Sequence, residues 1–549
     1  MASSQSSSLV SLQLYPQRAL GNFVLGSFLH EVLTRIKAEP LKYTKIELFY
    51  DAKDPVHKPV QVGLPANGIR LQFDGPEQRL RLIEVLDFTK NHITFKPSDK
   101  EIDLVRPQPS EDSGHGKSKT ALEQQAGPTF RHIYHRFLGP TYPGEYIPDK
   151  SNSRSGTFVL SYPGVAFTFS MRSDVYSAHK DNIALMSKSE VQVASSMAIF
   201  HGESWADARS KMWTEILPSL KTFPPLTKGG DTWPDEVSLI RLHGGGQVQM
   251  MRLWSDKCNW IRLGHTREAD IRRALGAPDA IYRKNDHKMD IHKGRAASHG
   301  GSRSRTRARR GSDILSDTDQ SSTHLSSDGY DSTGETMNSS SSSSSEEGAA
   351  NLSSEYFWNY FYLGFDILFS PRKPSSPPPP TKTPEIVSLG SSQPIFTDEV
   401  NVATKLILHS NVPGSYPFNR HRRVRWEIAY LNPDSSPSIQ NYNSETPFDT
   451  IKPALLEEWK DVYQSEETRA ADQRGMALNR GWGDSPGSSI EFMGGWEEEK
   501  GGRTPGIDGA SKSGKRFEGG EESTTTLFGF PGLVFEVLRN GYVSALTVF

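Results

Sequence analysis

The sequence predicts an α+β fold built from short helices and antiparallel strand meanders, and three observations lead to this prediction. A glycine followed by alternating apolar residues occurs four times, at 67–73, 163–169, 363–369 and 531–537. Such alternation is typical of a half-buried strand, because successive side chains point to opposite faces. A candidate amphipathic helix precedes each copy, and low-complexity segments interrupt the chain between copies. We therefore expect repeated helix-and-meander units packed into one or two composite cores, with long disordered insertions.

The glycine of each copy stands where a tight hairpin turn requires a positive φ, which glycine adopts without steric cost. These predicted turn residues are Gly68, Gly164, Gly364 and Gly532. The uneven spacing of the copies argues against a solenoid of regular repeats. Since one helix with one meander is too small to be stable alone, the units are expected to share cores.

Composition narrows the class of protein. The chain has 549 residues, 35% of them hydrophobic, a formal net charge of −2 and one cysteine, Cys258. The nearly balanced charge indicates no nucleic-acid partner, and a single cysteine excludes an internal disulfide framework. Residues 1–10 lack the features of a secretory signal, and the longest nearly apolar run, 356–369, is too short to span a bilayer. We therefore expect a cytoplasmic protein.

Helices are predicted where apolar residues recur with helical spacing. These segments are 29–36, 130–137, 266–276 and 449–459. Thr266 is expected to cap the third helix and Asp449 the fourth. Gly139 and Gly276, each closely followed by proline, are expected to end the second and third helices.

The helices and glycine phrases together divide the chain into units. We expect a first unit over 8–106, a linker over 107–127, and a region over 128–293 that holds the second unit and the start of the third. The strands of the third unit are expected over 355–430, and the fourth unit over 445–549. Disordered insertions are predicted from their Arg/Ser-rich, Pro-rich or Gly/Glu/Ser-rich composition at 294–354, 370–394 and 475–523.

Two short motifs raise the possibility of an enzyme. Residues 483–487 match a nucleophile elbow around Ser485, and residues 243–246 match an oxyanion-hole motif of esterases. However, glycine-rich sequence flanks Ser485 on both sides, and no histidine follows it in the chain. Residues 509–516 nearly match a phosphate-binding loop, but Arg516 stands where the hydroxyl residue should be. We therefore predict no enzyme, no catalytic residue and no cofactor.

Four residues in one short segment carry side chains that ligate metals: Asp286, His287, Asp290 and His292. Their spacing matches no known zinc pattern, so a polar surface turn is the favoured interpretation and no metal site is predicted.

An arginine cluster lies in the 294–354 insertion and consists of Arg303, Arg305, Arg307, Arg309 and Arg310. It is compatible with a nuclear signal, with contact to anionic lipid, or with a solvated linker, and acidic, serine-rich neighbours would screen or switch it.

A polar phrase at 409–414, His-Ser-Asn-Val-Pro-Gly, follows a predicted strand at 405–408. Its Asn411, Pro413 and Gly414 supply turn chemistry. We therefore interpret His409 as the end of a strand that enters a turn. Together with Asp366 of the third glycine phrase, these residues are predicted to be structural.

Several blocks resemble, in order, those of the phagophore (phagosome) assembly factor 1 family of eukaryotes. The blocks are 20–26, 68–71, 83–85, 275–278, 360–369, 409–414 and 535–537. The most specific are Leu-Gly-Phe-Asp-Ile-Leu-Phe at 363–369 and the phrase at 409–414. The likeness covers most of the chain outside the low-complexity insertions, which depart from the family.

The resemblance implies an autophagy protein without known catalysis. Members act with a β-propeller protein of the breast-carcinoma-amplified-sequence-3 type, whose propeller is thought to bind phosphoinositides. We therefore expect a scaffold or adaptor that is recruited from the cytoplasm to the phagophore assembly site and associates with phosphoinositide membranes indirectly. Two alternatives stay open. One is a trafficking module that binds anionic membranes through Arg303–Arg310, and the other is a hydrolase that uses Ser485.

Overall fold

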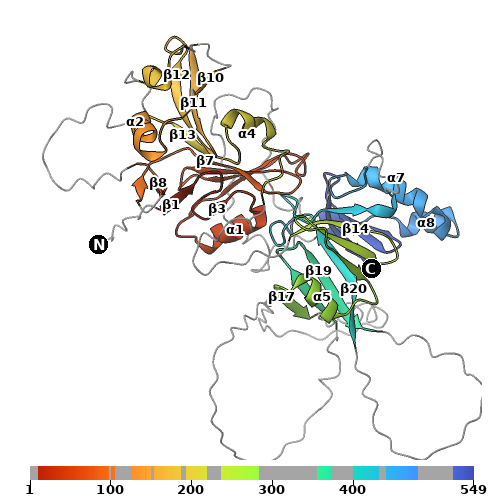
Figure 1. Cartoon of the computed structure of the whole chain (residues 1–549). Coiled ribbons are helices and arrows are strands. Elements are labelled where there is room, and N and C mark those ends of the chain that lie inside the picture. Colours follow the sequence, from red (N-terminus) through yellow and green to blue (C-terminus); the bar gives the residue numbers. More distant parts are fainter. Residues whose placement is uncertain are drawn as a thin grey trace, which may run out of the picture.

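The computed structural model describes twelve stretches of the chain. They are 10–97, 100–105, 127–141, 144–149, 154–177, 179–186, 193–218, 236–283, 355–372, 400–431, 441–479 and 524–549. They form two lobes, an N-terminal half that ends at 218 and a C-terminal half that begins at 236 (Figure 1). The predictions for Ser485, for residues 286–292 and for the cluster Arg303–Arg310 lie outside the described residues.

The described part of the N-terminal half contains two sheets. The larger has the order β10-β11-β12-β13-β7-β6-β5-β4 and is antiparallel throughout. Its strands are β4 (Glu47–Phe49), β5 (Val60–Leu64), β6 (Ile69–Phe73), β7 (Leu80–Val85), β10 (Glu145–Pro148), β11 (Ser155–Tyr162), β12 (Val165–Arg172) and β13 (Ser196–Ile199). The smaller has the order β3-β2-β1-β8-β9, with β1 parallel to β8. Its strands are β1 (Val10–Tyr15), β2 (Ala19–Leu20), β3 (Phe23–Val24), β8 (Asn91–Phe95) and β9 (Ile102–Asp103).

The described part of the C-terminal half repeats this plan. Its larger sheet is antiparallel and has the order β17-β18-β19-β20-β25-β24-β23-β22. These strands are β17 (Ala280–Arg283), β18 (Tyr356–Tyr360), β19 (Phe365–Pro371), β20 (Asn401–His409), β22 (Met476–Asn479), β23 (Thr524–Phe530), β24 (Leu533–Val537) and β25 (Val543–Val548). The smaller sheet has the order β16-β15-β14-β21, with β14 parallel to β21. It consists of β14 (Val237–Leu242), β15 (Gln247–Arg252), β16 (Cys258–Arg262) and β21 (Trp426–Ile428).

Helices accompany the sheets in both halves. In the N-terminal half they are α1 (Leu29–Ala38), α2 (Phe130–His132), the π-helix η1 (Ile133–Phe137), α3 (Asn182–Met186) and α4 (Trp205–Lys211). In the C-terminal half they are α5 (Glu268–Leu275), η4 (Ala429–Leu431), α7 (Phe448–Glu458), η5 (Lys460–Val462) and α8 (Glu466–Asp472). No helix among the described residues is long and apolar enough to cross a membrane.

The α+β prediction is confirmed, and one large hydrophobic core lies in each half. Each of the four glycine phrases contributes a hairpin, between β5 and β6, β11 and β12, β18 and β19, and β23 and β24. The turn glycines have positive φ angles of 59°, 74°, 88° and 77°. The first two hairpins share one sheet through the β13–β7 pairing, and the last two share another through β20 and β25. Sharing a sheet lets each hairpin bury a face that it could not bury alone.

Both predicted N-caps are wrong. Arg267 occupies the N-cap position of α5, while the Thr266 hydroxyl accepts the backbone N–H of Arg262 at 2.7 Å, so it closes the preceding turn. Pro447 occupies the N-cap position of α7, and Asp449 lies in the first turn, where a carboxylate still favours the helix dipole. Gly276 does end α5, with a φ of 87°. In addition, 476–479, inside a segment predicted to be disordered, form strand β22 against β23.

Candidate functional site at the junction of the two halves

The loop between β6 and β7 meets the segment that follows β20, and this contact joins the two halves. Gln78 in the loop and Asn411 in the segment are both buried and both have positive φ angles, 55° and 44°. Gln78 Nε2 donates to the Asn411 carbonyl at 2.8 Å, and Asn411 Nδ2 donates to Gln78 Oε1 at 2.8 Å. Asn411 Oδ1 also accepts the backbone N–H of Asn419 at 2.6 Å. The polar phrase at 409–414 therefore forms part of the contact between the halves.

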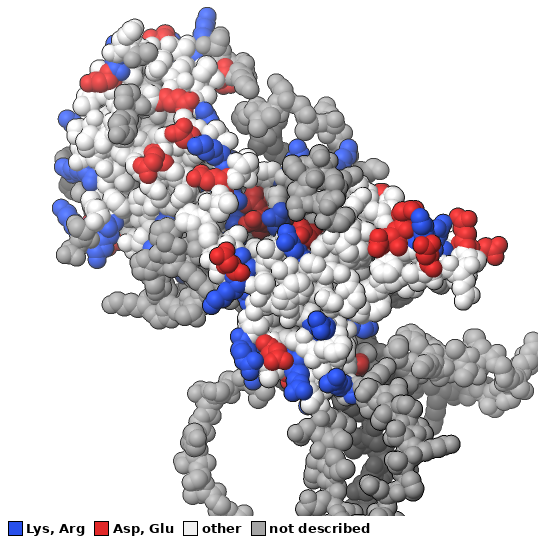
Figure 2. Space-filling view, turned by 45° about the vertical axis from the view of Figure 1, so that its right-hand side comes forward, with Lys and Arg blue, Asp and Glu red and all other residues white. Residues whose placement is uncertain are grey.

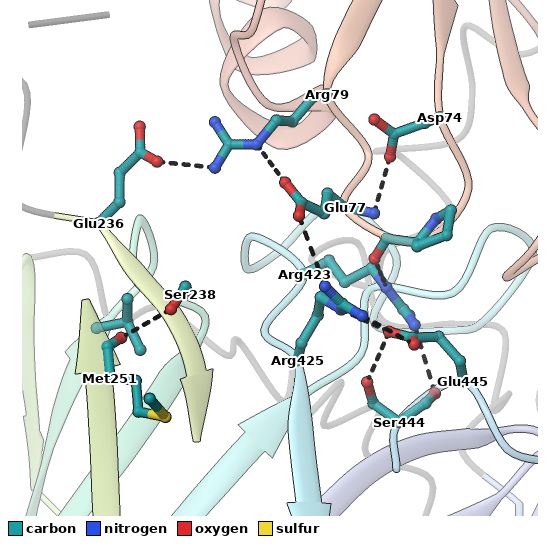
Figure 3. A network of polar contacts seen from close by, with 12 residues as sticks. Asp74, Glu77, Arg79, Glu236, Ser238, Met251, Arg423, Arg425, Ser444 and Glu445 are labelled. Atoms are coloured by element: carbon teal, nitrogen blue, oxygen red, sulfur yellow. Dashed lines mark hydrogen bonds and ion pairs between the residues drawn. The ribbon is translucent and has the colours of Figure 1, made fainter. Parts of the chain in front are cut away.

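Arg79 lies between two carboxylates that come from different halves (Figure 3). Its Nη2 is 2.7 Å from Glu236 Oε2, and its Nε is 2.5 Å from Glu77 Oε2. The side chains of Arg79 and Glu236 are only 7% and 9% exposed. Arg425 extends the network, with Nε 2.6 Å from Glu445 Oε1 and Nη1 3.6 Å from Glu77 Oε1. Opposite charges alternate here, so each desolvated charge has a partner.

Two consecutive arginines of the C-terminal half are buried at the same place. The guanidinium carbon of Arg422 lies 3.4 Å from the centroid of the Phe28 ring, and its Nη2 donates to the carbonyl of Val237 at 3.2 Å. Arg423 Nε donates to the carbonyl of Pro76 at 2.7 Å. Burial lowers the pKa of Arg422 to about 9 and that of Arg423 to about 10, so both remain charged at neutral pH. Backbone carbonyls replace the water that these cations lose.

A cleft of about 160 Å³ opens beside the network. Its lining combines charged residues of the junction with apolar residues, of which Trp213 and Ile216 are exposed. Arg81 in this lining is bonded through Nε to Asp74 Oδ2 at 2.6 Å. In the space-filling view, acidic and basic side chains lie close together where the two lobes meet (Figure 2). The arginines of the cleft thus already have counter-charges, so the lining does not select for an anion.

A second polar cluster lies at the C-terminal end of β20. His409 Nε2 is 2.9 Å from Asp366 Oδ2, and His421 Nε2 is 2.8 Å from Asp366 Oδ1. Asn359 Nδ2 donates to Asp366 Oδ1 at 2.9 Å. The two imidazole rings are stacked, with centroids 3.8 Å apart and planes 13° apart. One carboxylate therefore holds two histidines that are neighbours in space.

Burial by itself would raise the pKa of Asp366, but the hydrogen bonds and positive charge offered by His409 and His421 outweigh it and lower this pKa below the usual value. The carboxylate is ionised at neutral pH. Burial, together with the charge of His409, lowers the pKa of His421, so this imidazole is neutral there. The cluster therefore combines an ionised carboxylate with at least one neutral imidazole.

The structure places the predicted structural residues in two groups. Gly364, Asp366, His409 and Asn411 come together near the junction, where the Gly364 turn lies against the backbone of Arg422. Gly414, with a φ of 83°, approaches Tyr50 of the N-terminal half, and Pro413 lies beside it in the same segment. The remaining turn glycines, Gly68, Gly164 and Gly532, lie at separate hairpins.

Several residues of the site were not predicted from the sequence. Gln78, Arg79 and Glu236 gave no local signal, because the partners that they contact across the junction are far away in the chain. His421 belongs to the run His-Arg-Arg-Val-Arg at 421–425. So many basic residues within a segment expected to be ordered indicate a buried or functional polar cluster, and this signal could have identified His421. In residues 243–246, the glycines form the β14–β15 turn, and His243 Nε2 contacts Gln249 Oε1 at 3.1 Å.

Comparison with known proteins bears on both halves of the chain. The family model described as "Phagosome assembly factor 1" matches residues 19–107, 117–309 and 393–549. These ranges include both large sheets and the junction. The chain belongs to this family. Family membership therefore indicates a role in phagosome assembly.

Individual relatives extend the match. A PHAF1 protein of Drosophila melanogaster is 21% identical over 98% of this chain and 94% of its own length. A PHAF1 protein of Arabidopsis thaliana is 21% identical over 98% of this chain and 92% of its own length. One of Caenorhabditis elegans is 25% identical over 75% of this chain and 74% of its own length. No solved structure matches the chain.

Proposed function

We propose that this chain is a non-catalytic scaffold of autophagy that acts at the phagophore assembly site in complex with a phosphoinositide-binding β-propeller protein. Membership of the phagosome assembly factor 1 family supports the assignment of the chain to autophagy. The observation that carries the scaffold role is the junction, where buried, reciprocally bonded side chains join two halves that each have their own core.

A junction of this kind favours a fixed geometry. Interfaces that allow domain motion are usually polar and hydrated, whereas Arg79, Glu236 and Arg422 are desolvated. If the halves separated, Arg79 and Glu236 would lose each other, and Arg422 would lose its contact with the Phe28 ring. A partner that contacts both halves would then bind without a cost for ordering them relative to one another. This is the property that a scaffold needs.

The proposal is tested by affinity capture of the tagged full-length chain from its own cells, with mass-spectrometric identification and reciprocal capture. We expect enrichment of a β-propeller protein over the tag alone. A second arm uses Arg79→Met, which weakens the junction, beside Arg172→Met, which breaks the exposed ion pair with Asp174. Capture should fall with the first variant and persist with the second, when both are used below their melting temperatures.

Failure to recover any β-propeller protein, in either direction, would refute the partnership. Liposome flotation of the purified chain distinguishes the alternative of direct binding to anionic membranes. The chain alone could float with anionic vesicles, and replacement of the arginines in 303–310 by serine could abolish this flotation. That result would favour a membrane-binding module over the proposed adaptor. The proposal expects flotation only when the propeller protein is added.

A further inference from the structure

We propose that Asp366, His409 and His421 form a binding site for one divalent transition-metal ion, of the class represented by Zn²⁺ and Co²⁺. Such a site is independent of the scaffold role, because it lies within the C-terminal half and uses no residue of the Arg79 network.

The three donors come from separate parts of the chain and converge in space. Asp366 belongs to β19, His409 ends β20, and His421 lies in the segment after β20. One ligand atom from each lies within 4.8 Å of the others. Two imidazole nitrogens and one carboxylate oxygen are a donor set that suits zinc and related ions, with further positions left for water. Convergence of this kind was not visible in the sequence, where 55 residues separate Asp366 from His421.

The site is buried but not sealed. The side chains of His409, Asp366 and His421 are 15%, 10% and 8% exposed. A metal bound there would be largely shielded from solvent, and His409 is the most exposed of the three ligands. Asn359 supplies an outer-shell contact, since its Nδ2 donates to Asp366 Oδ1 and orients the carboxylate.

Metal binding also fixes the tautomer of each ligating ring. A ligating carboxylate is ionised and a ligating imidazole neutral, so with Nε2 as the ligand the ring hydrogen lies on Nδ1.

Binding demands one rearrangement. In the stacked arrangement the two Nε2 atoms face the carboxylate side by side, so they do not yet point to a common position. His421 is held by the ring of Phe361, with centroids 4.9 Å apart, whereas His409 is the more exposed of the two. The ring of His409 therefore turns, and the His409–His421 stack is lost when the metal enters. A purely structural cluster would keep the stack at every metal concentration.

The experiment titrates the chelator-treated full-length chain with Co²⁺, followed by its visible absorption, and then displaces Co²⁺ with Zn²⁺. We expect one equivalent of Co²⁺ per chain to bind with high affinity, and the melting temperature to rise with Zn²⁺ concentration. The variant Asp366→Asn keeps the size of the side chain and one hydrogen-bond acceptor but removes the charged ligand, so this equivalent should be lost. His421→Gln should also abolish it, and Asn359→Ala should weaken it by about 10- to 100-fold.

Two matched controls locate the ion. His243→Gln removes an exposed histidine of the same half and should leave the equivalent intact. Simultaneous replacement of Asp286, His287, Asp290 and His292 by serine removes the other candidate ligands and should also have no effect. Melting of each variant without metal shows that it is folded. Absence of a high-affinity equivalent in the parent chain, or its survival in Asp366→Asn and His421→Gln, would overturn the proposal.

Discussion

The side-chain amides of Gln78 and Asn411 are bonded across the junction, 333 residues apart in the chain. Gln78 donates to the Asn411 carbonyl, Asn411 donates to Gln78 Oε1, and both distances are 2.8 Å. Each residue holds a positive φ that is uncommon for a side chain other than glycine. Backbone strain of this kind persists only where the surroundings compensate for it. Each half therefore stabilises a positive-φ residue of the other half.

The first prediction concerns this amide pair. Gln78→Ala leaves the buried carbonyl and amide of Asn411 without these bonds, and we expect a loss of about 2 to 3 kcal/mol in the free energy of unfolding. Gln17→Ala is the control, because Gln17 also has a positive φ, 61°, but its amide contacts exposed Glu203 at 3.4 Å. The control should change stability by less than about 0.5 kcal/mol. Chemical denaturation measures the free energy of unfolding of both variants. Equal losses would show that the amide pair does not stabilise the fold more than an exposed amide does.

The second prediction concerns the buried ion pair of Arg79 and Glu236. Arg79→Met leaves a desolvated carboxylate without its counter-charge, and we expect a loss of about 3 to 5 kcal/mol. Adding Glu236→Gln should recover part of this loss, because the uncompensated charge is removed. Arg172→Met, at an exposed pair, should cost less than about 1 kcal/mol. If the double variant were no more stable than Arg79→Met, charge compensation would not be the cause.

The third prediction separates steric conflict from backbone strain in glycine turns. Gly364 and Gly276 have nearly equal φ angles, 88° and 87°. A Cβ at Gly364 would lie 2.5 Å from the Arg422 carbonyl oxygen, whereas nothing lies within 4 Å of a Cβ at Gly276. With a ψ of −171°, Gly276 lies in a backbone region that residues with a Cβ rarely adopt, so Gly276→Ala should cost about 1 to 3 kcal/mol from backbone strain alone. Gly364→Ala should cost clearly more, and Gly364→Val more again. Thermal melting compares the three, and equal melting temperatures would contradict the steric account.

The fourth prediction concerns acid. Burial, with the charge of His421 as the next cause, lowers the pKa of His30 to about 4 from 6.5. Because the folded chain binds this proton less readily than the unfolded chain, the stabilisation is present above pH 6.5 and is lost as the pH falls toward 4. At 1.36 kcal/mol per pKa unit, the loss is about 3 kcal/mol. His30 Nε2 donates to the Arg420 carbonyl at 3.1 Å, so His30→Gln can keep this bond.

Melting temperatures of the parent chain and His30→Gln between pH 7 and pH 4.5 test this prediction. The parent should lose stability more steeply, although His421, whose pKa is lowered in the same direction, keeps part of the slope in both. His135→Gln, at an exposed position of η1, is the control and should follow the parent. Parallel curves for the parent and His30→Gln would show that His30 does not carry the effect.

The sequence predicted the local parts of the fold and only fragments of the site. The hairpins at Gly68, Gly164, Gly364 and Gly532 follow from alternation and turn chemistry, which are properties of adjacent residues. The caps at Thr266 and Asp449 were wrong, since a boundary of one or two residues depends on contacts outside the helix. Asp366 and His409 were singled out as turn and motif residues. Their meeting with His421 depends on strand pairing, which periodicity does not specify.

Local sequence patterns therefore predicted the class of fold, the hairpin turns and, through the blocks at 363–369 and 409–414, the family. Tertiary structure was needed to show that the four hairpins combine into two large sheets, that Gln78 reaches Asn411, and that Asp366 holds two histidines. The physical reason is the range of the interactions. Turns and alternation are set within a few residues, whereas buried charges and amides select partners hundreds of residues away through complementary geometry that exists only once both halves are folded.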